Sequence, residues 1–273
     1  MTGRAPRHEP LATGPLAAAH ADFTGVEAFD WEALDASAYA PEVRERGRRA
    51  FVLRALDEQR SLLAFTQLLG ELCEAGAPID VIGSLSRVVR DEARHVDLCD
   101  RVVKKLGGWD AKVPEPNWVR SNPKTPVKRR ILATVIGSLC VGETVSVHMI
   151  KAVRENATDP VVHAVLTQML ADESFHSRFG WYWIESMPLD DADRAFAQRY
   201  LERLIPNLVK QLAPMQSARR QHVASPFGSA SSEARAEAYR AAVEKTILPG
   251  FDKAGLDASG LFRAASDQHK RAA

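Results

Sequence analysis

Two short stretches decide the fold of this 273-residue chain: Asp91-Glu92-Ala93-Arg94-His95 and Asp172-Glu173-Ser174-Phe175-His176. Both have the form Asp-Glu-x-x-His, and both lie in segments whose apolar residues recur with the period of a helix. Residues three apart on a helix share a face, so each stretch directs one carboxylate and one imidazole to the same side. The sequence therefore predicts two helices that each present a Glu and a His as a pair.

The residues around these stretches predict four long helices. Gly76 suits a helix C-cap, and Pro78 suits the first turn of the helix that follows. Asp159 and Pro160 form the corresponding start of the last helix. The expected helices cover residues 41–75, 78–106, 126–156 and 160–187. Residues 107–126 are rich in Pro and Gly, and we expect them to form a long connection that crosses a bundle.

No set of alternating strands is visible, so the expected fold class is all-α. We expect an N-terminal arm over 1–44, a four-helix bundle over 45–187 and a C-terminal helical extension over 188–273. The extension contains helices near 190–213 and 231–247, followed by a polar tail. The arm either wraps the bundle through Phe23, Phe29 and Trp31 or is a partly disordered tail.

Composition excludes several classes of protein. The net charge is only +1, which gives no argument for binding nucleic acid or an anionic membrane. Three Cys residues without a spaced framework are typical of a reducing compartment. The N-terminus lacks the apolar stretch of a signal peptide, and we expect no window to approach the roughly 18 apolar residues of a spanning helix. The sequence thus predicts a soluble, cytoplasmic protein without a membrane or nucleic-acid partner.

Glu143 is the only acidic residue in the apolar stretch 131–150. Burying a carboxylate costs several kcal/mol unless something pairs with it, and a metal ion supplies such a pairing. In an antiparallel helix pair, Glu143 and Glu173 fall at the same height to within about 2 Å. The alternative is that Glu143 faces the solvent.

The first helix offers Glu58 as the corresponding residue, because it shares a face with Leu62 and Phe65. Its expected height differs from that of Glu92 by about one helical turn, or 6 Å. Asp57 is expected to face outward. Glu71 and Glu74 lie nearer the turn and match the height of Glu92 less well.

Two Glu-x-x-His pairs, with one further Glu from each of two other helices, are the ligand set of a dinuclear carboxylate site in a helical bundle. Oxygen-rich ligation with one imidazole per metal favours iron or manganese over zinc. The predicted ligands are Glu58, Glu92, His95, Glu143, Glu173 and His176. Asp91 and Asp172 are predicted to accept hydrogen bonds from the ligand imidazoles, as carboxylates often do around metals. The alternative for both is an ion pair at the surface with Arg90 or Arg94.

These motifs resemble the ferritin-like superfamily of non-haem di-iron carboxylate proteins over about residues 45–187. The members with similar metal motifs include rubrerythrins, aldehyde-deformylating oxygenases and bacterial multicomponent monooxygenases. The run from Asp91 to His95 is similar to the Asp-Glu-x-Arg-His signature of the monooxygenases. That resemblance implies that Asp91 orients His176 and that Asp172 orients His95.

Three departures narrow the resemblance. Ser146 stands where rubrerythrin-like peroxidases have a further Glu, Cys99 where reductase small subunits have a radical Tyr, and Met169 where arylamine N-oxygenases have an extra His. What remains implies a stand-alone di-iron oxidase or oxygenase that activates O₂ to oxidise a small organic substrate. The implied cofactor is two iron ions, with manganese as the other candidate. The implied partners are O₂, the substrate and an unknown electron donor, with a homodimer as a possible assembly.

Two other functions are compatible with the same residues. One is a ferritin-like or rubrerythrin-like protein that oxidises iron or reduces peroxide without an organic substrate. The other is a metal-stabilised helical scaffold that binds a partner through its arm and tail. Binding of many irons per chain would indicate the iron-oxidising or peroxide-reducing protein. A lack of O₂ consumption by the iron-loaded protein would indicate the scaffold.

Overall fold

The computed structural model describes residues 14–109, 122–187, 189–217 and 225–272, and the regular elements within these ranges are all helices. This confirms the all-α class. The chain divides into two compact units. Unit 1 comprises Met1–Ser121, Arg154–Asp172 and Ala224–Ser229, and unit 2 comprises Asn122–Val153, Glu173–Val223 and Ala230–Ala273. The predicted division at 45–187 remains a prediction.

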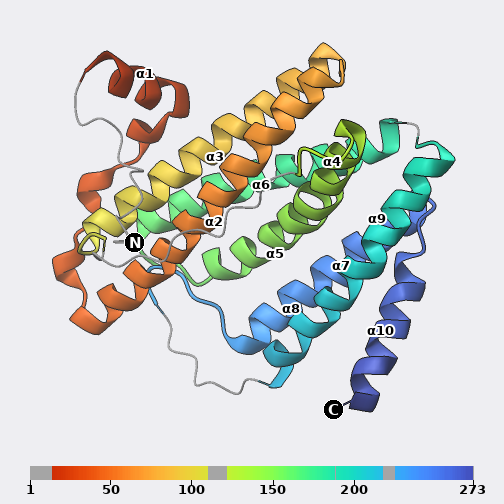
Figure 1. Cartoon of the computed structure of the whole chain (residues 1–273). Coiled ribbons are helices and arrows are strands. Elements are labelled where there is room, and N and C mark those ends of the chain that lie inside the picture. The colour runs from red at the N-terminus through yellow and green to blue at the C-terminus, as the bar shows by residue number, and fades with distance from the viewer. Residues whose placement is uncertain (1–13, 110–121, 188, 218–224, 273) are drawn as a thin grey trace. The chain divides into compact units, whose positions relative to one another are not determined.

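Two long helices, α2 (Pro41–Glu74) and α3 (Ile79–Lys105), form a hairpin that dominates unit 1 (Figure 1). Both lie within one residue of the predicted bounds. Gly76 in the connecting turn has a φ of 67°, a left-handed conformation that favours glycine. The prediction that Gly76 ends the first long helix is therefore confirmed, and its left-handed backbone conformation is the reason.

The N-terminal part of unit 1, within the predicted arm, consists of short helical elements, which speaks against the alternative of a disordered tail for these residues. Its elements are α1 (Pro15–Thr24) and the 3₁₀ turns η1 (Val26–Ala28), η2 (Trp31–Ala33) and η3 (Ala36–Ala38). Trp31 is buried under the guanidinium of Arg101 on α3, as the wrapping alternative requires, whereas Phe23 is exposed. Residues 1–13 of the predicted arm lie outside the described residues.

Helix α6 (Pro160–Ser186) begins in unit 1 and continues into unit 2. Asp159 caps its start, because its Oδ1 accepts hydrogen bonds from the backbone N–H groups of Val161 and Val162, both at 3.0 Å. The other carboxylate oxygen accepts a 2.8 Å bond from the hydroxyl of Tyr39. The start of this helix agrees with the prediction to within one residue.

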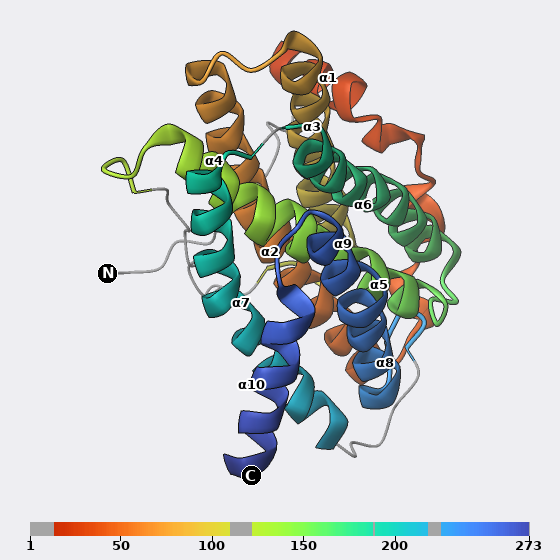
Figure 2. The same cartoon turned by 90° about the vertical axis from the view of Figure 1, so that its right-hand side faces the viewer.

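Unit 2 contains the remaining helices, and several of them follow one another without a break (Figure 2). They are α4 (Val127–Thr134), the π-helix η4 (Val135–Gly142), α5 (Glu143–Arg154), residues 173–186 of α6, α7 (Asp191–Ser217), α8 (Ser232–Ala242), the π-helix η5 (Val243–Ile247), α9 (Leu248–Lys253) and α10 (Ala258–Ala272).

The polar tail expected after residue 247 was wrong, because α10 is a helix that packs against α7. Ala258 and Ala265, seven residues apart, are buried on one side of α10. Most of the remaining side chains on this helix are polar and exposed or half-buried. Leu261 and Phe262 are half-buried as well, so α10 is an amphipathic helix within a segment of mostly polar residues.

The sequence analysis expected no segment as apolar as a membrane-spanning helix. The continuous helix Val127–Arg154 corrects this expectation, since it is long and apolar enough to cross a membrane. Its most apolar window has a mean hydropathy of 1.5, and half of that window is buried within the protein. Core helices of soluble proteins have the same properties, so one such helix is weak evidence for a membrane span.

The connection after α3 begins with Gly107 and Gly108, whose φ angles are 126° and 85°. Both values lie in the left-handed region, which explains why glycine ends the helix. The predicted bundle crossover falls mainly on residues 110–121, which lie outside the described residues.

Candidate metal centre

Unit 1 contains a buried group of two carboxylates and one imidazole, which we call the first triad: Glu58, Glu92 and His95. Glu58 comes from α2 and the other two residues from α3. The Nδ1 atom of His95 lies 3.4 Å from an oxygen of Glu58 and 3.9 Å from an oxygen of Glu92. One ligand atom from each residue lies within 4.8 Å of the others, so the triad could hold a metal ion.

The hairpin of α2 and α3 explains why Glu58 reaches this position. Glu58 precedes Gly76 by 18 residues and His95 follows Pro78 by 17, so these two residues lie at nearly the same height. The one-turn mismatch expected from the sequence arose from comparing Glu58 with Glu92 instead. Asp57, the neighbour of Glu58, is exposed as expected.

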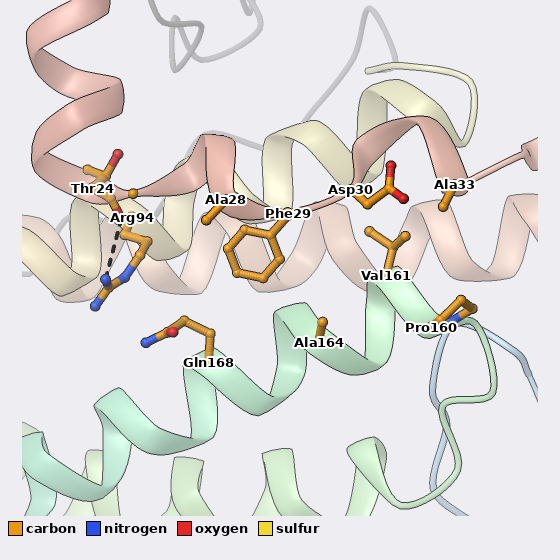
Figure 3. Close-up of a pocket in the computed structure, with 11 residues that line it drawn as sticks. Thr24, Ala28, Phe29, Asp30, Ala33, Arg94, Pro160, Val161, Ala164 and Gln168 are labelled. Carbon is orange, nitrogen blue, oxygen red and sulfur yellow. Dashed lines mark hydrogen bonds between the residues drawn. The ribbon is translucent and has the colours of Figure 1, made fainter.

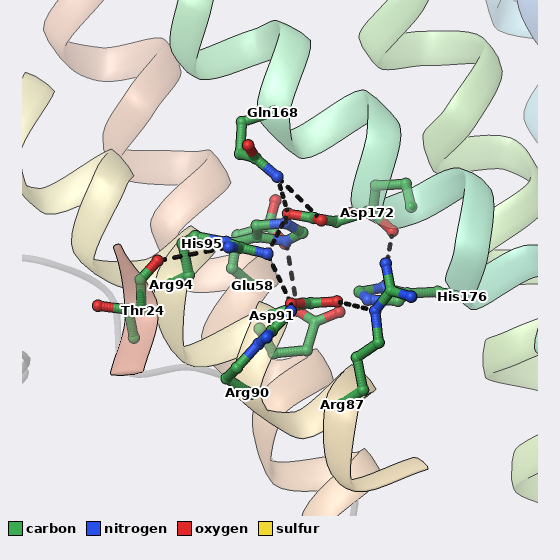
Figure 4. Close-up of polar contacts among 12 residues, drawn as sticks. Thr24, Glu58, Arg87, Arg90, Asp91, Arg94, His95, Gln168, Asp172 and His176 are labelled. Atoms are coloured by element: carbon green, nitrogen blue, oxygen red, sulfur yellow. Dashed lines mark hydrogen bonds and ion pairs between the residues drawn. The ribbon is translucent and has the colours of Figure 1, made fainter. Parts of the chain in front are cut away.

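Asp172 on α6 fixes the orientation of His95, as the resemblance implied. Nε2–H of His95 donates to Oδ2 of Asp172 over 3.1 Å, which leaves Nδ1 directed at the triad carboxylates. The same carboxylate accepts hydrogen bonds from Arg94 at 2.9 Å and from the amide of Gln168 at 3.0 and 3.1 Å (Figure 4). The imidazole is therefore held by a carboxylate that two other side chains immobilise.

Asp91 is fully buried and pairs with arginines on its own helix. It accepts a 2.6 Å hydrogen bond from Arg94 and another from Arg90, and Arg87 lies 3.5 Å from its second oxygen. The alternative role predicted for Asp91, an ion pair with Arg90 or Arg94, therefore names the right partners, although Asp91 is buried and not at the surface. The expected contact of Asp91 with His176 remains a prediction.

The electrostatics of the first triad favour a positive charge at His95. Burial by itself lowers the pKa of His95, but hydrogen bonds with Asp172 and Glu58 and the charges of Glu58 and Glu92 raise it well above the ordinary value of 6.5. The carboxylates that raise the pKa of His95 would also attract a metal cation to Nδ1.

Cys99 lies one turn beyond His95 and is completely buried. Burial and the nearby charge of Glu58 raise its pKa well above the ordinary value of 9.0. The thiol therefore stays protonated, and it contributes no thiolate to the site.

Unit 2 contains a second buried group of the same composition, the second triad: Glu143, Glu173 and His176. Glu143 is only 4 % exposed, so the alternative that it faces the solvent was wrong. The Nδ1 atom of His176 lies 3.7 Å from an oxygen of Glu143 and 3.4 Å from an oxygen of Glu173. The three ligand atoms again lie within 4.8 Å of one another.

The helix that carries Glu143 departs from α geometry immediately before this residue. Residues Val135–Gly142 form a π-helix, an element that occurs frequently at functional sites. Gly180 on α6 lies against this segment, and a Cβ atom at that position would lie 2.7 Å from Cβ of Leu139. The two helices approach closely because residue 180 has no side chain, and this approach helps to set the separation of Glu143 from Glu173.

A hydroxyl pair links the two helices of the second triad next to the ligands. The hydroxyls of Thr144 and Ser177 lie 2.8 Å apart, and Nε1–H of Trp181 donates to Thr144 over 3.1 Å. Trp181 also packs edge-on against Phe251 of α9, with ring centroids 5.0 Å apart.

Three supporting residues escaped the sequence reasoning: Thr144, Gln168 and Ser177. Each lies within four positions of a predicted ligand or its carboxylate partner, so proximity in sequence was the available signal. Proximity in sequence does not show which of the neighbouring side chains points toward the ligands.

Comparison with protein-family models, with curated proteins and with solved structures gives no match. The site is therefore assessed on its own chemistry. Each triad offers two carboxylates and one imidazole nitrogen in a buried setting, a donor set that suits divalent iron or manganese. A divalent cation would offset the two negative charges of each triad, so the residues present fit a bound metal.

Proposed function

We propose that the two triads bind two iron ions as one dinuclear centre within a ferritin-like four-helix bundle. We further propose that the protein is an O₂-dependent oxidase or oxygenase that acts on a small organic substrate. The observation that carries this proposal is the duplication of one buried donor set. In both triads, a histidine Nδ1 lies 3.4–3.9 Å from oxygens of two glutamates.

Helix α6 supports the assignment of both triads to one centre. Its residue Asp172 contacts His95 of the first triad, and the next residue, Glu173, contacts His176 of the second. Consecutive residues of a helix point about 100° apart, so one turn of α6 serves both imidazoles. Asp172 and Glu173 are adjacent residues of one continuous helix, so the two contacts lie on the same turn of α6.

Bound ferrous iron would supply the electrons and the open coordination positions that O₂ reduction requires. The chain's own residues would have three roles. The four glutamates would neutralise the two cations, and the two histidines would hold one ion each. Asp172 keeps His95 in the tautomer that is protonated at Nε2, so that Nδ1 can bind the metal. Burial of all six side chains excludes bulk water from the donors.

Anaerobic titration with ferrous iron, followed by measurement of O₂ uptake, tests the proposal. We expect saturation near two irons per chain and O₂ consumption that stops after one turnover unless a reductant and a substrate are added. An iron-oxidising protein would instead continue to consume O₂ as ferrous iron is supplied and would accumulate many irons per chain. Absence of iron binding would overturn the proposed centre, and iron binding without O₂ uptake would overturn the proposed activity.

A further inference from the structure

A cavity of about 500 Å³ lies in unit 1, outside the first triad (Figure 3). Its walls come from the segment that follows α1, from α3 and from the first turns of α6. Cavities that bind small molecules have volumes of about 300–1,000 Å³, so this one has a suitable size. The residues that line it include Ala28, Phe29, Asp30, Arg94, Ala164 and Gln168.

The two ends of the cavity differ in charge. Arg94 and Gln168 lie at one end, Asp30 lies toward the other, and the ring of Phe29 lies between them opposite Ala164 (Figure 3). The NH1 group of Arg94 makes, within the described residues, only a long 3.4 Å hydrogen bond to the carbonyl of Thr24. This group is therefore available to a ligand with a hydrogen-bond acceptor.

The guanidinium of Arg94 favours an anionic acceptor. Asp91 and Asp172, the two carboxylates that pair with Arg94, are shared with other cationic side chains. Arg87 and Arg90 also pair with Asp91, and His95 pairs with Asp172. A carboxylate would form a charge-assisted hydrogen bond at this end. Asp30 would repel the ligand carboxylate at the other end, so the ligand would bind with its carboxylate toward Arg94.

The position of the cavity relative to His95 indicates its role. Arg94 and Gln168 both hydrogen-bond to Asp172, which in turn accepts from Nε2 of His95. Glu58 lies at the opposite nitrogen, Nδ1. A molecule in the cavity would therefore be separated from the metal-facing side of the imidazole and would act on it only through Asp172.

We propose that this cavity is an effector site for a small carboxylic acid with an aromatic or branched apolar body. The carboxylate binds Arg94 beside Gln168, and the apolar body lies along Phe29 and Ala164. Binding draws Arg94 toward the ligand and changes the hydrogen bond between Asp172 and His95. This inference does not depend on the proposed iron chemistry, because every residue involved belongs to unit 1 and needs no metal.

The test is calorimetric titration of the metal-free full chain with 4-phenylbutyrate, 4-phenylbutanol and 4-phenylbutylamine, which share one apolar body. We expect the carboxylate to bind at least about tenfold more tightly than the alcohol or the amine, because only it forms the charge-assisted bond. Tighter binding of the amine or the alcohol, or no binding of any probe, would overturn the carboxylate assignment.

Two variants locate the binding, and an exposed residue nearby provides the control. Ala164→Trp fills the cavity from α6, and Ala28→Trp fills it from the opposite wall if the first variant does not fold. Either should weaken 4-phenylbutyrate binding at least tenfold, whereas His163→Trp, next to Ala164 but not among the residues that line the cavity, should leave it unchanged. Equal binding by the cavity-filling variants and the control would overturn the site.

The effector role has a separate readout. In the metal-free protein, the ¹⁵N signal of the His95 Nε2–H group should shift when 4-phenylbutyrate binds, and the signal of the exposed His163 should not. Binding without any shift at His95 would overturn the effector role.

Discussion

The first and second triads contain the same three side chains but have different surroundings. Around the first, charged groups predominate: Asp172 and Asp91 are buried and are held by Arg94 and its neighbours. Beside the second, the hydroxyls of Thr144 and Ser177 lie 2.8 Å apart and link the two helices. The close contact at Gly180 and the π-helix before Glu143 complete that environment. The comparison indicates that a network of charged side chains holds the first donor set, and that close packing of two helices contributes to the position of the second.

Loss of a triad glutamate should have the largest effect. Glu58→Ala and Glu143→Ala each remove one donor and one buried charge, so each variant should lose at least one bound metal ion per chain. Metal analysis after ferrous loading measures this directly. The exposed Asp57→Ala and Glu202→Ala provide matched controls in the two units. If a triad variant keeps the full metal content, its glutamate is not a ligand.

Asp172→Asn should have the next largest effect, and mainly on the first triad. The substitution keeps the shape but weakens the hydrogen bond from His95, and such changes typically cost about 10–100-fold in metal affinity. Competition with a chelator measures the change. Ser177→Ala is the comparison in the second triad, where loss of an uncharged partner should change the affinity less. Equal losses in the two variants would contradict the difference between the triads.

Gly180→Ala should destabilise the fold by about 1–3 kcal/mol, since the new methyl group overlaps Leu139 and its backbone. Because the contact separates the helices of the second triad, metal binding there should weaken more than in the first. Gly70→Ala is a matched control, because nothing lies within 4 Å of a Cβ atom at that position. Chemical denaturation gives the free energy of unfolding. A neutral effect of Gly180→Ala would show that packing does not constrain this site.

The smallest expected effect concerns pH. The pKa of His95 is raised in the folded, metal-free protein, so the stabilisation from its proton is complete below pH 6.5 and decreases as pH rises through the folded pKa. The free energy of unfolding should fall above pH 6.5 with a slope of at most about 1.4 kcal/mol per pH unit. Urea denaturation from pH 6 to 9, compared between the native chain and His95→Asn, isolates this contribution. Parallel curves would contradict it.

The sequence predicted the positions of α2, α3 and α6 closely, because Gly76, Pro78 and Asp159 are strong local signals. It also named the residues that form both triads. Two Glu-x-x-His motifs supply four of them, Glu143 is the only acidic residue in an apolar stretch, and Glu58 shares a helix face with apolar residues. Their assembly into one centre stays a prediction.

Features that depend on tertiary packing could not be predicted in the same way. The π-helix before Glu143 leaves no distinct pattern in an apolar stretch, and the contact at Gly180 involves a residue about forty positions away from its partner. Helix α10 was missed although its sequence is amphipathic, because most of its residues are polar. Arg94 lies within a predicted motif, yet its contact with Asp172 depends on how α6 packs against α3.

The central claim is that the two triads act together on a pair of metal ions, and the Mössbauer spectrum of the ⁵⁷Fe-loaded, oxidised protein in an applied magnetic field tests it most directly. If both ions share one centre, the iron should form a single magnetically coupled, diamagnetic species at two irons per chain. A spectrum of isolated, paramagnetic ferric ions, or no bound iron, would contradict the claim.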